Sequence, residues 1–282
     1  MQLWVKVLVF VSSWIVLFSL FTFYMSVHPR KIVTHLVPSD LRLKYEEISF
    51  KTKDGIKLSG WYIPHDKSKK AVIIMHGYPA DKANLLGMAD FIAQEYNVFL
   101  FDFRSFGQSE GKYTTIGYLE KNDLLAAIDY LEKEKNITSI GLFGFSMGGA
   151  VALMTKHENV KAIVSDSTYS RLSNMVKHMY GIFSVFKYPL AYLTKIYGMI
   201  FLNVDIDRIN PVESIQNIDK PILLIHGEND SQIPVAEGYA LHEASNNSQL
   251  WIVKGADHGA THSIDQDEYE KKVLEFFRKS LG

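Results

Sequence analysis

Residues 141–149, Gly-Leu-Phe-Gly-Phe-Ser-Met-Gly-Gly, constrain the fold of this 282-residue chain more than any other segment. They place Ser146 between Gly144 and Gly148, directly after the apolar run 140–145. Glycines permit a sharp turn from a buried strand into a helix, and such a turn leaves the serine at the top of a sheet. A serine hydroxyl is a weak nucleophile unless a base and oxyanion donors surround it. The segment therefore predicts a strand, a turn and a helix that present Ser146 as a nucleophile, with those other groups supplied elsewhere in the chain.

Short apolar runs alternate with helical patterns along most of the sequence. The first pair reads as a hairpin, with strands at 46–52 and 56–63 around the turn dipeptide Asp54-Gly55. The later predicted strands span residues 71–75, 98–103, 139–145, 160–165, 221–225 and 249–253. The predicted helices span residues 82–95, 117–134, 147–157, 236–245 and 267–280. This alternation predicts an α/β fold with a mostly parallel sheet covered by helices on both faces.

Residues 170–210 do not fit the alternation. They are rich in aromatic residues and methionine, among them Met175, Met179, Tyr180 and Phe183. We expect a helical cap insertion over the carboxyl edge of the sheet. Its apolar side chains could simply pack on the sheet, or they could line a pocket for an acyl group or dip into a membrane. The lining role is the one that we favour.

Two polar residues follow predicted strands in the second half of the chain. Asp230 stands five residues after the run 221–225, and His258 follows the run 249–253. Active sites in parallel sheets form beyond the carboxyl ends of the strands, so these residues are expected near Ser146. His258 would accept the proton of Ser146, and Asp230 would orient and stabilise the imidazolium.

Both assignments have a rival in the sequence. His262 stands four residues beyond His258, which is nearer to the end of the strand. Asp166 follows the predicted strand 160–165, the other place where such a sheet can hold the acid. We favour His258 as the base and Asp230 as its acid.

The oxyanion that the attack creates needs backbone donors. One is expected to be the N–H of Met147, at the start of the helix after Ser146, where the helix dipole also helps. The other is expected from the loop that His76 and Gly77 shape, as the N–H of Tyr78. These two amides would form the oxyanion hole.

A polar segment begins at the end of the predicted strand 98–103. It contains Asp102, Arg104 and Ser109. Since a buried charge needs a partner, we expect these side chains to form a buried polar brace beneath the loop of Tyr78.

Four motifs together carry a resemblance to a known family. They are His76-Gly77-Tyr78, Asp102-Phe103-Arg104-Ser105-Phe106-Gly107-Gln108-Ser109, Gly144-Phe145-Ser146-Met147-Gly148-Gly149, and the pair Asp230 and His258. Residues 45–282 resemble the α/β-hydrolase superfamily, most closely its branch of serine aminopeptidases and monoacylglycerol-lipase-like enzymes. The resemblance implies the α/β-hydrolase fold and a Ser-His-Asp triad, with no metal and no organic cofactor. The chain departs from the family at Ser105, where glycine is usual.

The amino-terminal segment has no charged residue from position 7 to position 27 and is rich in Val, Leu, Phe and Trp. A run of this length suffices to cross a hydrocarbon core of roughly 30 Å. Trp4 and Tyr24 fit the two interfaces. We expect a transmembrane anchor over residues 3–27 and a juxtamembrane connector over residues 28–44, ahead of the hydrolase domain at 45–282.

Two other interpretations of the amino terminus are open. A cleaved signal peptide would have a shorter apolar region and an A-x-A-like site, which residues 26–29 match poorly. A buried core helix would normally show a polar face, and this segment has none. The positive charge of Lys6 and the amino group nearly balances that of Arg30 and Lys31, so the charges favour neither orientation. An anchored amino terminus is similar to the membrane-bound serine hydrolases of the superfamily.

Composition argues against other classes of protein. The net charge is −1 with acids and bases interspersed, whereas a nucleic-acid surface needs a concentrated basic patch. The chain has no cysteine, which excludes disulfides, cysteine zinc sites and a thiol nucleophile.

The sequence thus predicts a membrane-anchored serine hydrolase that cleaves an ester, thioester or small amide through an acyl-enzyme. Its expected partners are a small-molecule acyl substrate and the membrane, and the sequence carries no signal of an oligomeric state. The alternatives are an acyltransferase or a short-peptide peptidase on the same triad, and a non-catalytic receptor or scaffold. A non-catalytic relative commonly loses a triad residue, and this chain has all three.

Overall fold

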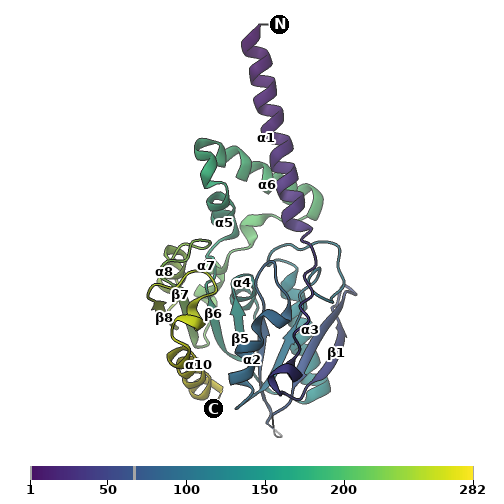
Figure 1. Ribbon diagram of the computed structural model, residues 1–282, viewed down its shortest axis with the longest axis vertical. Helices are drawn as coiled ribbons and strands as arrows, with labels where there is room; N and C mark the ends of the chain where they lie inside the picture. The colour runs from purple at the N-terminus through teal and green to yellow at the C-terminus, as the bar shows by residue number, and fades with distance from the viewer. Residues whose placement is uncertain (1, 66–67, 282) are drawn as a thin grey trace.

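An eight-stranded sheet forms the centre of the molecule (Figure 1). The structure is a computed structural model that describes residues 2–65 and 68–281. The strand order is β1-β2-β4-β3-β5-β6-β7-β8. Strands β1 and β2 form an antiparallel edge, and the six strands β3 to β8 run parallel to one another. The strands are β1 (Glu46–Lys51), β2 (Lys57–Ile63), β3 (Lys70–Met75), β4 (Asn97–Phe101), β5 (Ser139–Phe145), β6 (Val160–Asp166), β7 (Ile222–Gly227) and β8 (Ser248–Val253).

Helices cover both faces of this sheet. On β3, Ala71, Ile73 and Met75 pack on one face, while Val72 and Ile74 pack on the other. Because both faces are buried, the inner strands are largely apolar, as is typical of parallel strands. The first face is covered by α3 (Glu120–Lys135), α4 (Met147–Met154) and α8 (Ala236–Glu243), and the second by α2 (Leu86–Ile92) and α10 (Gln266–Leu281). The α/β class predicted from the sequence is confirmed.

Shorter helices lie in the connections. They are the α-helices α7 (Pro211–Ser214) and α9 (Thr261–Ile264) and the 3-10 helices Pro38–Leu41, Lys82–Leu85, Ile206–Arg208 and Ile215–Asn217. The predicted helix 82–95 therefore begins as a 3-10 turn, which Asp81 caps by accepting a hydrogen bond from the N–H of Ala83 at 3.1 Å. Strand β4 ends before the predicted residue 103, because the N–H of Phe103 donates to His76 Nε2 at 3.1 Å.

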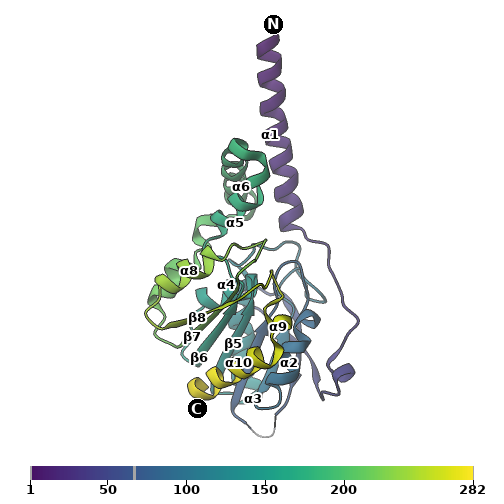
Figure 2. The same ribbon diagram turned by 60° about the vertical axis from the view of Figure 1, so that its left-hand side comes forward.

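Residues 170–210 form a helical cap above the carboxyl ends of the strands (Figure 2). Its main elements are α5 (Leu172–Met179), a 3-10 helix (Gly181–Phe186) and α6 (Lys187–Leu202). We call these three elements the cap. The expected helical insertion is thus present, and its place over the strand ends puts it above any site formed there.

Helix α1 (Leu3–Val27) projects far from the rest of the molecule (Figures 1 and 2). Within the described residues it is the one helix long and apolar enough to cross a membrane. Its second half packs against the cap and buries Ser19, Phe23 and Val27, which recur every four residues on one face. Its first half exposes large apolar side chains such as Trp4, Leu8 and Phe10.

Two buried ion pairs lie in the segment predicted as a polar brace. Lys82 Nζ lies 2.6 Å from Asp102 Oδ2, and both side chains are almost inaccessible to solvent. Arg104 lies 2.7 Å from the buried Asp123 and 2.8 Å from the more exposed Asp54. Asp102 and Arg104 therefore have separate partners, which the sequence motif alone did not reveal.

Two serines complete the brace. The hydroxyl of Ser109 donates to the Asp102 carbonyl at 2.6 Å and accepts from the N–H of Ser59 at 2.9 Å. Ser105 has a φ of 69°, a left-handed conformation that favours glycine. Its hydroxyl donates to the Tyr113 carbonyl at 2.7 Å, which holds the turn with a serine in place.

We predict that Asp102→Ala destabilises the fold by about 3–5 kcal/mol, because it leaves the Lys82 ammonium buried without its partner. The matched control is Asp129→Ala, which breaks a solvent-exposed pair with Lys133 and should cost only about 0–1 kcal/mol. Urea unfolding of the detergent-solubilised protein measures both. Equal losses in the two variants would contradict the buried pair.

Candidate active site

Ser146 lies at the turn between β5 and α4, with φ 54° and ψ −115°. This is a strained conformation for a residue with a side chain, and such strain is concentrated at functional sites. A Cβ atom on Gly144 would lie 2.4 Å from the backbone of Gly148, and one on Gly148 would lie 2.3 Å from the Met75 carbonyl oxygen. The two glycines are therefore needed for close backbone packing, which starts the helix at the very end of the strand.

Asp230 and His258 form a hydrogen-bonded pair beyond β7 and β8. Asp230 Oδ2 lies 2.8 Å from His258 Nδ1, and the carboxylate is fully buried. Its second oxygen accepts the N–H groups of Gln232 and Ile233, at 3.0 and 2.7 Å. Because Nδ1 faces the carboxylate, Nε2 is the ring nitrogen that can exchange a proton with a reacting group.

Asp257 joins the two loops that carry this pair. The sequence by itself assigns it no role in the site. One of its carboxylate oxygens accepts the N–H and the hydroxyl of Ser231, at 2.8 and 2.9 Å, and the N–H of His258 at 2.7 Å. These hydrogen bonds, led by the one from the Ser231 backbone, lower the pKa of Asp257. Asp257 is therefore a positioning residue that sequence reasoning missed, since its three bonds span two loops.

The two sequence rivals lie elsewhere. His262 Nε2 lies 3.0 Å from Glu270, on α10. Asp166 is buried, and burial raises the pKa of its carboxyl group. Its carboxylate accepts three hydroxyl groups, those of Ser167, Thr261 and Tyr269. The structure brings Asp230, and neither rival, to His258.

The loop after β3 is shaped by a neutral histidine. His76 Nδ1 lies 2.7 Å from the Gly77 carbonyl oxygen, to which it donates, and Nε2 accepts the N–H of Phe103. Burial lowers the pKa of His76, which keeps the ring uncharged. A Cβ atom on Gly77 would lie 2.9 Å from the Phe145 ring, so the loop passes close to the nucleophile turn.

Tyr78 and Met147 flank Ser146 at the same cavity. Among the described residues, no acceptor takes a hydrogen bond from either of their backbone N–H groups. Met147 opens α4, whose N-terminus carries the positive end of the helix dipole. Both amides are thus available to a bound group at the place where the sequence predicts an oxyanion hole.

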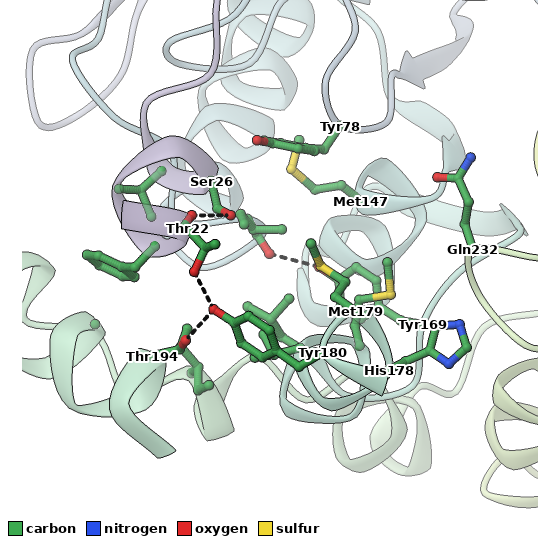
Figure 3. A pocket seen from close by; sticks show the side chains of 18 of the residues that line it. Thr22, Ser26, Tyr78, Met147, Tyr169, His178, Met179, Tyr180, Thr194 and Gln232 are labelled. Atoms are coloured by element: carbon green, nitrogen blue, oxygen red, sulfur yellow. Dashed lines mark hydrogen bonds between the residues drawn. The ribbon is translucent and has the colours of Figure 1, made fainter. Parts of the chain in front are cut away.

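The cavity above Ser146 has a volume of about 680 Å³, within the range of roughly 300–1,000 Å³ typical of small-molecule sites. Ser146 and His258 both line it, although no hydrogen bond joins their side chains in the described part of the chain. Such catalytic contacts are often long before substrate binds. Most of the other lining residues come from the cap and from α1, and loops that carry Ile116, Tyr169 and Gln232 add to the wall (Figure 3).

Comparisons with known proteins agree with this architecture. Two family models match the chain, one described as "alpha/beta hydrolase fold" over residues 70–186 and one as "TAP-like protein" over residues 203–280. An esterase of Pyrococcus furiosus, Pf2001, superimposes with a TM-score of 0.77 at 30% identity, covering 91% of this chain and 99% of the esterase. The chain belongs to the α/β-hydrolase superfamily, as the motifs predicted.

Relatives among curated proteins are more distant. The uncharacterised protein YqkD of Bacillus subtilis is 27% identical over 231 residues, which cover 79% of this chain and 75% of YqkD. WAV2 of Arabidopsis thaliana, an alpha/beta hydrolase domain-containing protein, is 26% identical over 86% of this chain and 82% of its own length. Together with the esterase structure, these similarities support hydrolase activity.

We predict that Asp257→Ala lowers kcat for p-nitrophenyl acetate on the order of tenfold, because the loops of Asp230 and His258 lose their link and the pair loses its alignment. KM and the melting temperature should change little, since Asp257 is exposed. The control is Asp219→Ala, at another exposed aspartate outside the site. Steady-state kinetics that are equal for the two variants would contradict the positioning role.

Proposed function

We propose that this protein is a membrane-anchored serine hydrolase that cleaves an ester, thioester or small amide of an apolar acyl substrate. One observation carries the proposal. The strained Ser146 and the Asp230–His258 pair face a single, largely apolar cavity beside two available backbone amides. A purely structural role explains neither the backbone strain nor this convergence.

The reaction would proceed in two steps through an acyl-enzyme. Ser146 Oγ attacks the carbonyl carbon of the substrate while His258 Nε2 takes the hydroxyl proton. His258 then gives that proton to the leaving group, and the acyl group stays on Ser146. Water attacks the acyl-enzyme by the same route in reverse, releasing the acid and restoring the serine. Asp230 stabilises the imidazolium that forms in both steps.

The oxyanion of each tetrahedral intermediate would be bound by the N–H groups of Tyr78 and Met147. Preorganised amides stabilise such a charge strongly because they need no reorientation during the reaction. The buried pair of Lys82 and Asp102 supports the Tyr78 loop from below, since the N–H of Lys82 donates to Asp102 at 2.7 Å. No metal or organic cofactor takes part in this proposed chemistry.

The chemistry of the cavity supports an apolar acyl group. No Asp, Glu, Lys or Arg stands among its described lining residues, which include Met175, Met179 and Phe183. A peptide substrate would bring charged ends and several backbone amides into this cavity with few partners for them. An ester or thioester bond is therefore favoured over a peptide bond, in line with the Pyrococcus esterase.

The membrane anchor in this proposal is α1. Its outer half exposes large apolar side chains such as Trp4, Leu8 and Phe10, each more than two-thirds exposed. Placing such a surface in the hydrocarbon of a bilayer is favourable, whereas exposing it to water is not. We assign residues 3–27 to the anchor, 28–44 to the connector and 45–282 to the hydrolase domain, with 170–210 as its cap insertion.

We predict that a fluorophosphonate probe labels the purified full-length protein and that Ser146→Ala abolishes the labelling, because the probe reacts with an activated serine. The control is Ser263→Ala, which removes a hydroxyl on α9 that donates to the Ala260 carbonyl at 3.0 Å. Asp230→Asn should slow the labelling, because the amide cannot stabilise the imidazolium. Labelling that survives Ser146→Ala would overturn the proposed nucleophile.

We also predict a preference for longer acyl chains, because the cavity is deep and apolar. The test is the rate of hydrolysis of p-nitrophenyl esters of graded length, with Ser146→Ala as the blank. The rate per enzyme should be highest for chains of about eight carbons or more. A maximum at acetate would contradict an acyl-lining role for the cap.

A further inference from the structure

The helix that the sequence marks as an anchor also forms a wall of the cavity. Thr22, Ser26 and Val27 of α1 line it together with Ser146 and Tyr78. Figure 3 shows Thr22 and Ser26 beside the cavity, with Tyr78 above and Tyr180 below them. An anchor that served only as a tether would not need to face the nucleophile.

Buried hydroxyl groups hold α1 in one position on the cap. Thr22 Oγ1 lies 2.5 Å from the hydroxyl of Tyr180, which lies 3.2 Å from Thr194 Oγ1 (Figure 3). One turn away, Ser19 Oγ lies 3.2 Å from the hydroxyl of Tyr197. Hydrogen bonds are directional, so these contacts set the register of α1 against the cap.

The position of the cap along α1 limits where a bilayer can lie. The first ring contact between them joins Trp14 and Phe183, whose centroids are 6.1 Å apart. Residues 3–13 precede this contact and give only about 16 Å of helix at 1.5 Å per residue. A hydrocarbon core is about 30 Å thick and takes about 20 helical residues. A bilayer that α1 spans therefore also surrounds the turns of α1 that pack on the cap.

The cap surface at this level is suited to lipid. Apolar and aromatic side chains are exposed there, namely Ile182, Val185, Phe186, Tyr188, Tyr192, Met199, Ile200 and Phe201. Lys195 is paired with Asp205 and Asp207, and Lys187 lies over the Tyr188 ring, from which its long side chain can reach the interface. Exposed patches of this kind mark contact with a partner or a membrane.

The rim of the cavity belongs to the same surface. Met179 and Ile182 line the cavity and are 59% and 87% exposed, whereas Ser146, at its inner end, is 7% exposed. The cavity thus leads from the lipid-suited face of the cap to the nucleophile. An acyl chain that entered there would pass from hydrocarbon to an apolar pocket without being hydrated.

We propose that the cap lies in the leaflet that surrounds the second half of α1 and that the cavity opens sideways into the hydrocarbon. The substrate is then a long-chain acyl ester resident in the bilayer, and α1 is part of its binding site. This inference rests on the proposed hydrolase function and adds the source of the substrate and the route that it takes.

The depth of the cap can be measured with single cysteines, because the chain has none of its own. Val185→Cys and Ile200→Cys lie on the exposed cap surface and outside the cavity lining, and Ile264→Cys on α9 is the matched control. Each full-length variant carries an environment-sensitive NBD label in phosphatidylcholine vesicles with acyl-chain spin-labelled lipid. The two cap labels should lose fluorescence to the quencher, and the α9 label should not. Equal quenching at all three sites would overturn the placement.

The wall formed by α1 is tested by filling the cavity. Ser26→Phe adds volume beside the acyl route, and Met25→Phe introduces the same aromatic side chain at an exposed position of α1 outside the lining. The measured quantity is the ratio of the turnover of vesicle-embedded 4-methylumbelliferyl palmitate to that of p-nitrophenyl acetate. Ser26→Phe should lower this ratio on the order of tenfold, and Met25→Phe should leave it unchanged. Equal ratios in the two variants would overturn the role of α1.

These outcomes separate the inference from the proposed function. Fluorophosphonate labelling of Ser146 and hydrolysis of p-nitrophenyl acetate report on the catalytic site alone. If both persist while the cap labels are not quenched, entry from the bilayer is wrong and the hydrolase function stands. If labelling and acetate hydrolysis are both absent from the wild-type protein, the hydrolase function fails, whatever the depth of the cap.

Discussion

The close packing of the β5–α4 turn is the constraint on which the rest of the site depends. Gly144 lies so near the backbone of Gly148, and Gly148 so near that of Met75 on β3, that one added carbon at either glycine would overlap its neighbour. Helix α4 therefore starts at the end of the strand, Ser146 takes a strained conformation, and the Met147 amide faces the cavity. This unfavourable backbone conformation persists because the packing of the buried sheet and helices around the turn holds it in place.

Polar contacts then align the loops around this turn. The loop of Tyr78 is held by a neutral His76 and by the buried pair of Lys82 and Asp102. On the other side, the exposed Asp257 links the loops that carry the proposed acid and base. Buried ion pairs add little net stability by themselves, so their value here lies in fixing one geometry, a role that buried polar groups have in some proteins.

Helix α1 and the cap pack together above the sheet and form much of the cavity wall. Because α1 is held by the hydroxyls of Thr22 and Ser19, the proposed membrane span and the proposed substrate cavity share one set of contacts. The bilayer would then complete the environment of the enzyme, covering the apolar cap surface and supplying the substrate. Function and membrane placement would depend on the same interface.

The sequence by itself determined the alternating elements, the turn at Ser146, and the candidates Asp230 and His258, because periodicity, turn residues and chain order are local signals. Only the tertiary structure decided which acid meets His258, which partner each buried charge has, and that α1 lines the cavity. The contact of Ser19 with Tyr197 joins residues 178 positions apart, and no local pattern encodes such a pairing. It arises when the sheet, the cap and α1 pack together, since only then do distant side chains share one buried space.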